Sequence, residues 1–153
     1  AFAFAQSYGE DSDLDALFLF NKLSSMAPWG KVFFSWVMLL FGVTHFVYTD
    51  FAAKLVPAWI PGAFFWTYVS GIALIGSGTA IILRIRVKEI GFLLGLMIFL
   101  WFIILHLPRA IADPWGNAGN ELTSAFQALG FSGIALIISG LAKQATIPKN
   151  QQN

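Results

Sequence analysis

The sequence predicts an all-α integral membrane protein, a bundle of four transmembrane helices. Hydrophobic residues make up 58% of the 153-residue chain and charged residues 11%, whereas soluble domains average about 45–50% and about 25%. Four apolar stretches are also close to the ~20 residues that a helix needs to cross the hydrocarbon core of a bilayer. A surface this apolar requires lipid as its solvent, and the length suits a single domain.

The four predicted spans are bounded by prolines or charged residues, and none has a charged side chain inside it. They cover residues 31–48, 61–83, 90–107 and 122–142. Basic residues are distributed unevenly between the two sides of this bundle, and the side richer in Lys and Arg is expected to face the cytoplasm. That side carries Lys22, Lys31, Arg84, Arg86, Lys88, Lys143 and Lys149, against Lys54 and Arg109 on the other. Both termini are therefore predicted to be cytoplasmic.

The first 29 residues are predicted to form a separate extension, followed by the membrane domain at 30–143 and a short polar tail at 144–153. Ser12 and Asp15 resemble a capping box, and apolar residues then recur at roughly helical spacing. We expect an amphipathic helix over residues 13–26 that lies in the membrane interface; the alternative is a loosely ordered tail. Residues 1–6 are too short for a signal peptide, and as the remnant of one they would put the N-terminus on the opposite side.

An internal repeat links the second and fourth spans. SGIALIGSG at residues 70–78 is nearly identical to SGIALIISG at residues 132–140, with an offset of 62 positions. His45 corresponds within one residue to His106, and each histidine precedes a connection that contains Pro and Trp. The sequence therefore predicts a pair of helices that is present twice, in parallel orientation.

The repeated segments also predict how the helices pack. Small residues recur at intervals of seven, and in membrane helices small residues allow close approach of a neighbour. The predicted packing residues are Ser70, Gly71, Ser77, Gly78, Ser132, Gly133, Ser139 and Gly140. We expect leucine at Gly71 or at Gly133 to disrupt the fold.

Polar residues gather at the end of the bundle that holds both histidines. The candidate ligand pocket consists of His45, Trp59, Trp66, His106, Arg109 and Glu121. Three interpretations remain open. The histidines ligate a haem or a metal, a use that the spacing does not support. Alternatively, the pocket binds a quinone or a lipid, with Trp66 or Trp101 against the ring. In the third, the histidines satisfy neighbouring protein groups and bind nothing.

No catalytic residue is assigned. The chain contains no Cys, which excludes disulfides, iron–sulfur clusters and thiolate sites within it. It has no phosphate-binding loop and no nucleophile with a nearby base in the sequence. The net charge of +1 and the scattered basic residues do not favour nucleic acid as a partner.

Four segments resemble the DoxX/DoxD-like family of small membrane proteins. They are GVTHFVYTDF (residues 42–51), LVPAWIPG (55–62), FWTYVSG (65–71) and HLPR (106–109), and the resemblance extends over residues 30–142. It implies a four-helix bundle in a bacterial inner membrane, and links to quinone-coupled or redox-related membrane complexes. The matching positions at the outer end are His45, Pro57, Trp59, Pro61, His106, Pro108 and Arg109.

The function expected from these observations is that of a non-catalytic membrane subunit. It would dock, through its N-terminal segment, onto a larger complex that transfers electrons or converts energy. The alternative is a subunit of a quinone-linked oxidoreductase, with its site at the outer end of the bundle. The expected partners are membrane lipids and other membrane subunits.

Overall fold

The structure is a computed structural model that describes residues 2–144. Within this range, the side chains of residues 2–16, 20–21, 23–24, 26–28, 117 and 143–144 lie outside the description. The predicted polar tail lies almost wholly outside the described residues. The elements, all helical, are α1 (Phe2–Val47), α2 (Thr49–Leu55), α3 (Ala63–Ile82), α4 (Val87–Trp101), the π-helical turn η1 (Phe102–His106), α5 (Leu107–Ala112) and α6 (Gly116–Gln144).

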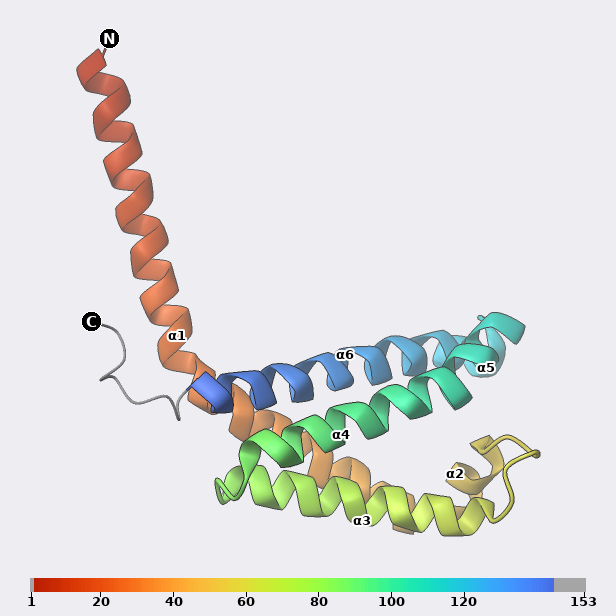
Figure 1. Ribbon diagram of the computed structural model, residues 1–153. Coiled ribbons are helices and arrows are strands. Elements are labelled where there is room, and N and C mark those ends of the chain that lie inside the picture. The colour runs from red at the N-terminus through yellow and green to blue at the C-terminus, as the bar shows by residue number, and fades with distance from the viewer. Residues whose placement is uncertain (1, 145–153) are drawn as a thin grey trace.

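Four of these helical segments are long and apolar enough to cross a membrane, which confirms the predicted bundle. They are Trp29–Val47, Ala63–Ile82, Val87–Ala112 and Ala118–Ala142. Each agrees with one of the four stretches recognised in the sequence, and the chain is a multi-pass membrane protein. In Figure 1, the four segments run side by side, with α2 and α5 at one end.

The third span continues beyond its predicted end at residue 107. Proline lacks the N–H that an α-helix needs and crowds the carbonyl four residues before it, so Pro108 was expected to end the helix. Instead, the helix widens into η1 before the proline, where the Leu107 N–H bonds the carbonyl of Phe102. Pro108 then sits in the first turn of α5, where its missing N–H costs little.

The N-terminal extension is continuous with the first span. The α1 helix has 46 residues, or about 69 Å at 1.5 Å per residue, more than twice the thickness of the hydrocarbon core. Because α1 already begins at Phe2, the expected helix start at Ser12 is wrong. Figure 1 shows the part before the bundle leaving it at a steep angle to the spanning helices. Its placement in the membrane interface stays a prediction.

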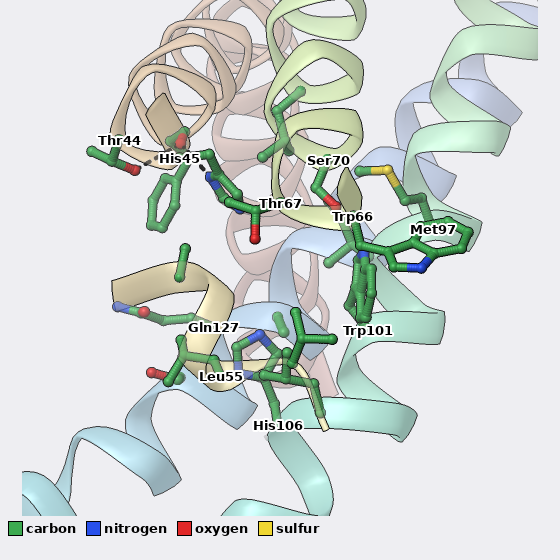
Figure 2. A pocket seen from close by; sticks show the side chains of 18 of the residues that line it. Thr44, His45, Leu55, Trp66, Thr67, Ser70, Met97, Trp101, His106 and Gln127 are labelled. Carbon is green, nitrogen blue, oxygen red and sulfur yellow. Dashed lines mark hydrogen bonds between the residues drawn. The ribbon is translucent and has the colours of Figure 1, made fainter. Parts of the chain in front are cut away.

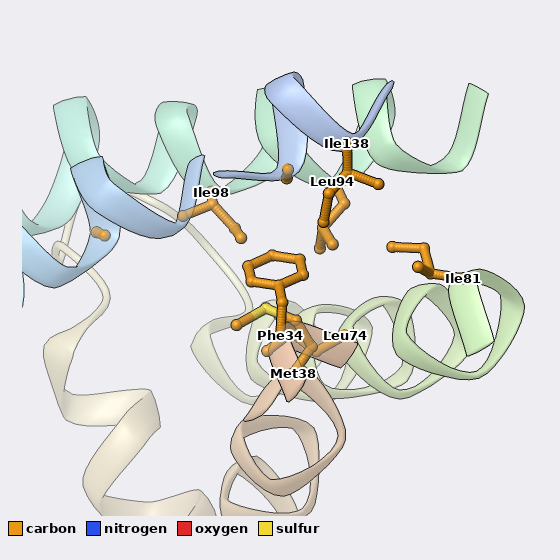
Figure 3. Close-up of a cluster of buried hydrophobic side chains, with 9 residues drawn as sticks. Phe34, Met38, Leu74, Ile81, Leu94, Ile98 and Ile138 are labelled. Atoms are coloured by element: carbon orange, nitrogen blue, oxygen red, sulfur yellow. The ribbon is translucent and has the colours of Figure 1, made fainter. Parts of the chain in front are cut away.

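The spanning helices are arranged as two hairpins. The α1 helix packs mainly against α3, and α4 packs mainly against α6, while α3 and α4 make a smaller contact. This is the pairing that the internal repeat predicts. Buried side chains from all four helices meet between the hairpins (Figure 3), and they include Phe34, Met38, Leu74, Ile81, Leu94, Ile98 and Ile138.

Glycines set the close approach within the first hairpin. A Cβ atom on Gly71 would lie 2.8 Å from Phe46 and 3.0 Å from the Cβ of His45. A Cβ on Gly78 would lie 2.7 Å from the backbone oxygen of Ser35. Real Cβ atoms do not approach other atoms this closely, so only glycine fits. The predicted packing role of Gly71 and Gly78 is confirmed.

The second hairpin uses different residues. Gly133 and Gly140 have open space where a Cβ would be, so their predicted packing role is wrong. Ser132 and Ser139 face α4 instead: the Ser132 hydroxyl donates to the carbonyl of Gly95 at 2.9 Å, and that of Ser139 to the carbonyl of Lys88 at 2.6 Å. Successive residues of a helix point about 100° apart, so the rotation of the helix about its axis decides which of them faces the neighbouring helix. The repeated motif therefore places its glycines against α1 in the first hairpin and its serines against α4 in the second.

Candidate functional site

A cavity of about 540 Å³ lies between the spanning helices at the end of the bundle where α2 and η1 are found. Ligand sites in helical bundles have this position and size, and combine apolar walls with a few polar groups. The cavity draws on α1, α2, α3, α4, η1 and α6. Met97 lines the cavity together with polar and aromatic residues that include Thr44, His45, Tyr48, Trp66, Thr67, Ser70, Trp101, His106, Ser124, Gln127 and Phe131.

His45 reaches the cavity from the last turn of the first span. Its Nδ1 atom lies 2.7 Å from the backbone oxygen of Phe41. A carbonyl oxygen only accepts hydrogen bonds, so Nδ1 carries the proton and donates it. In the neutral ring, Nε2 then keeps its lone pair, which is the form that ligates a metal or accepts a hydrogen bond.

His106 reaches the cavity from the other side, at the end of η1. Figure 2 shows the two imidazole rings on opposite sides of the space. No hydrogen bond joins the His106 ring to any residue that the structure describes. Single π-helical turns within α-helices often mark functional sites, and this one ends on His106, whose ring forms no hydrogen bond with the described residues.

Two tryptophans form one wall of the cavity. The rings of Trp66, on α3, and Trp101, on α4, meet edge to face, with centroids 6.3 Å apart and an interplanar angle of 76°. Met97 lies one turn before Trp101 and lines the same wall (Figure 2). Aromatic and thioether side chains give a flat, polarizable surface that suits the face of a ring.

One known protein family matches this chain. The model of a domain family of unknown function, DUF8561, matches residues 34–120, more than half of the chain. The chain belongs to the DUF8561 family. The matched segment contains both histidines and both tryptophans of the cavity. No curated protein and no solved structure matches the chain.

Within this DUF8561 chain, three of the six predicted pocket residues line the cavity: His45, Trp66 and His106. Trp59 does not, because it lies in the loop after α2 with 73% of its surface exposed.

Arg109 and Glu121 also lie outside the cavity lining, where they pair with each other. Arg109 Nε donates to Glu121 Oε2 at 2.8 Å, and a second bond joins Arg109 Nη2 to Glu121 Oε1. A bidentate pair of this kind satisfies both charges. The salt bridge links α5 to α6 instead of offering a charge to a ligand.

Several cavity residues of the DUF8561 chain were not singled out as such from the sequence. Ser70 was assigned to helix packing, but it is buried and lines the cavity. Thr67, Met97 and Gln127 also line it. A weak signal was present, because Trp66 and Ser70 are four positions apart and so share one face of a helix. The neighbouring helices that would receive this face could not be inferred from spacing alone.

The arrangement places two imidazoles and a tryptophan pair around a mostly apolar space. No group of three or more His, Cys, Asp and Glu side chains that could hold a metal occurs among the described residues of the DUF8561 chain. The cavity can receive an amphipathic molecule whose polar atoms meet His45 Nε2 or the ring of His106, while its apolar part contacts Trp66 and Trp101.

Proposed function

We propose that the chain is an accessory, non-catalytic subunit of a larger membrane complex, docked through the part of α1 that precedes Trp29. The observation that carries this proposal is a run of exposed apolar side chains on that part of the helix. Leu17, Phe18 and Leu19 are 57%, 65% and 56% exposed, and Trp29, the first residue after this segment, is 74% exposed. These side chains lie outside the core that the four spanning helices share.

A protruding helix of this kind needs a partner. Isolated helices are marginally stable in water, and most of their stability in proteins comes from packing an apolar face. The membrane interface would cover part of this surface, and a neighbouring subunit at the same level would cover the rest. The steep angle between this segment and the bundle supports such an arrangement (Figure 1).

The setting that we propose is a bacterial inner membrane, with both termini in the cytoplasm. The bias of Lys and Arg toward one end supports the orientation. The resemblance of the histidine and proline motifs to DoxX/DoxD-like proteins supports the compartment and an electron-transfer or energy-converting complex as the partner.

The double variant Leu17→Glu/Phe18→Glu is expected to release the chain from its complex. Burying each apolar side chain contributes about 1.5–3 kcal/mol, so two charges in their place would weaken docking by at least about a hundredfold. In a native gel of mildly solubilised membranes, the wild type should migrate with its partners and the variant alone. Deleting residues 1–28 should have the same effect.

Ser25→Glu is the matched control. Ser25 is exposed on the same segment, and its hydroxyl donates to the Lys22 carbonyl of its own helix, so the control should stay in the complex. A wild-type chain that migrates alone would contradict the subunit function. Release by Ser25→Glu as well would show that any charge on the segment is sufficient, and would remove the argument from Leu17 and Phe18.

A second candidate function, quinone-linked electron transfer, is favoured by the cavity. A quinone has a flat ring and two carbonyl oxygens, and a histidine N–H can donate to such an oxygen. The ring of His106 forms no hydrogen bond with the described residues, and Trp66 and Trp101 offer ring surfaces on the adjoining wall. In this function, the chain would hold the quinone for a redox centre elsewhere in the complex.

Trp101→Leu is expected to weaken the binding of a short-chain quinone about tenfold, which corresponds to about 1.4 kcal/mol. Quenching of tryptophan fluorescence in the purified chain measures this binding, because two tryptophans line the cavity. Trp59→Leu, which removes an exposed tryptophan outside the cavity, should leave the affinity unchanged. An equal loss of quinone affinity in both variants, or the absence of fluorescence quenching in the wild type, would exclude the quinone site.

A further inference from the structure

A second hollow lies between α1 and α6, toward the opposite end of the bundle from the histidine cavity. It is a groove of about 310 Å³ whose lining includes Phe33, Val37, Ile134, Ile137 and Leu141. The groove exists because α1 packs mainly against α3 and α6 packs mainly against α4. Here the two hairpins meet through aromatic rings, with the Phe34 and Phe131 centroids 6.3 Å apart.

One charged side chain lines this groove. Lys31 lies where α1 enters the bundle and is partly buried. Among the described residues, the one ion pair joins Arg109 to Glu121 at the other end of the bundle, so Lys31 has no carboxylate partner within that part of the chain. The ammonium group therefore stands at the mouth of an apolar groove with its charge uncompensated by described protein groups.

The end of the bundle at which Lys31 lies is positively charged. The turn between α3 and α4 is at this end (Figure 1), and Arg84, Arg86 and Lys88 are exposed there, beside one acidic residue, Glu89. Anionic lipid headgroups bind such basic sites between transmembrane helices.

We propose that the groove between α1 and α6 binds one anionic phospholipid, with an acyl chain along the groove and the phosphate at Lys31. The dimensions favour a lipid chain over a partner helix. One turn of a helix, about 10 Å across and about 5.4 Å long, takes up roughly 420 Å³, which is more than the groove of about 310 Å³ can hold. The charge of Lys31 selects an anionic headgroup, and the apolar lining selects a hydrocarbon tail.

The test is the thermal stability of the detergent-purified chain with dioleoyl phosphatidylglycerol or dioleoyl phosphatidylcholine, which share the same tails. A ligand that binds the folded state raises its melting temperature. The phosphatidylglycerol lipid should stabilise the wild type by several degrees more than the phosphatidylcholine lipid, and Lys31→Ala should abolish this difference. Lys22→Ala should not, because Lys22 is exposed on the same helix outside the groove.

A second pair of variants tests the groove itself. Gly30 lines it, and Gly76 lies on α3 away from it; both have open space where a Cβ would be. Gly30→Leu should therefore fill the groove and reduce the lipid effect, while Gly76→Leu should leave it intact, both without disturbing the fold.

The proposal would be overturned by equal stabilisation by the two lipids, a full effect in Lys31→Ala, a full effect in Gly30→Leu, or the same stabilisation by glycerol 3-phosphate alone. The last result would mark a phosphate site without a lipid. A dimer that persists without added lipid and is lost in Gly30→Leu would identify a second copy of the chain as the occupant, and would also refute the lipid. None of these outcomes depends on docking through residues 2–28.

Discussion

Gly71→Leu is expected to destabilise the bundle by about 3 kcal/mol, because an added side chain has no room between α1 and α3. A Cβ alone would lie 3.0 Å from the Cβ of His45 and 3.2 Å from the carbonyl oxygen of Gly42, which belongs to the backbone and cannot turn aside. Leucine adds three more carbons at the same point. The hairpin would have to separate, and the core between the hairpins would open with it.

Gly133→Leu is the matched control for this prediction. It makes the same substitution at the equivalent position of the repeat, where no atom lies within 4 Å of the added Cβ. We expect its melting temperature in detergent to stay close to that of the wild type, while Gly71→Leu melts well below it. An equal fall in melting temperature in the two variants would mean that Gly133 of α6 contacts a neighbouring helix, contrary to the described packing.

Removing Arg109 is expected to cost about 2 kcal/mol, and removing the charge of Glu121 less than about 1 kcal/mol. The difference follows from burial. The Glu121 side chain is 13% exposed and that of Arg109 is 37% exposed. Arg109→Met leaves a mostly buried carboxylate without a partner, whereas Glu121→Gln leaves a guanidinium that can turn toward water.

Chemical or thermal unfolding of the two single variants and of the double variant Arg109→Met/Glu121→Gln measures this asymmetry. The double variant should be more stable than Arg109→Met alone, because it no longer buries an unpaired charge. If the losses of unfolding free energy in the two single variants add up to the loss in the double variant, the two side chains act independently. The salt bridge would then not hold α5 to α6.

The positions of the spans could be predicted from the sequence because each span must satisfy a simple requirement, about 20 apolar residues between charges or prolines. The repeat also predicted the hairpin pairing. The end of the third span could not be predicted. Pro108 signals a break, and the sequence does not show that a π-helical turn at Phe102–His106 lets the helix continue past it.

The packing residues and the site were predicted in part. Small residues that recur every seven positions indicate which residues share a face of the helix. This spacing does not determine how each helix is rotated about its axis. Gly71 therefore packs as predicted and Gly133 does not. At the site, the paired histidines were recognised from the repeat. Arg109 and Glu121 belong to the same end of the bundle, but twelve positions separate them in the chain, and this spacing does not show that they pair with each other instead of facing the cavity.

The two-hairpin arrangement divides the helix contacts into those within a hairpin and those between hairpins. Because α1 packs mainly on α3, the next spanning helix in the chain, the main contact of the first hairpin does not involve α4 or α6. The second hairpin closes on itself in the same way. The histidine cavity and the α1–α6 groove both lie between the hairpins. Both hollows therefore depend on how the two hairpins sit against each other, and a change at the contact between the hairpins would alter both of them.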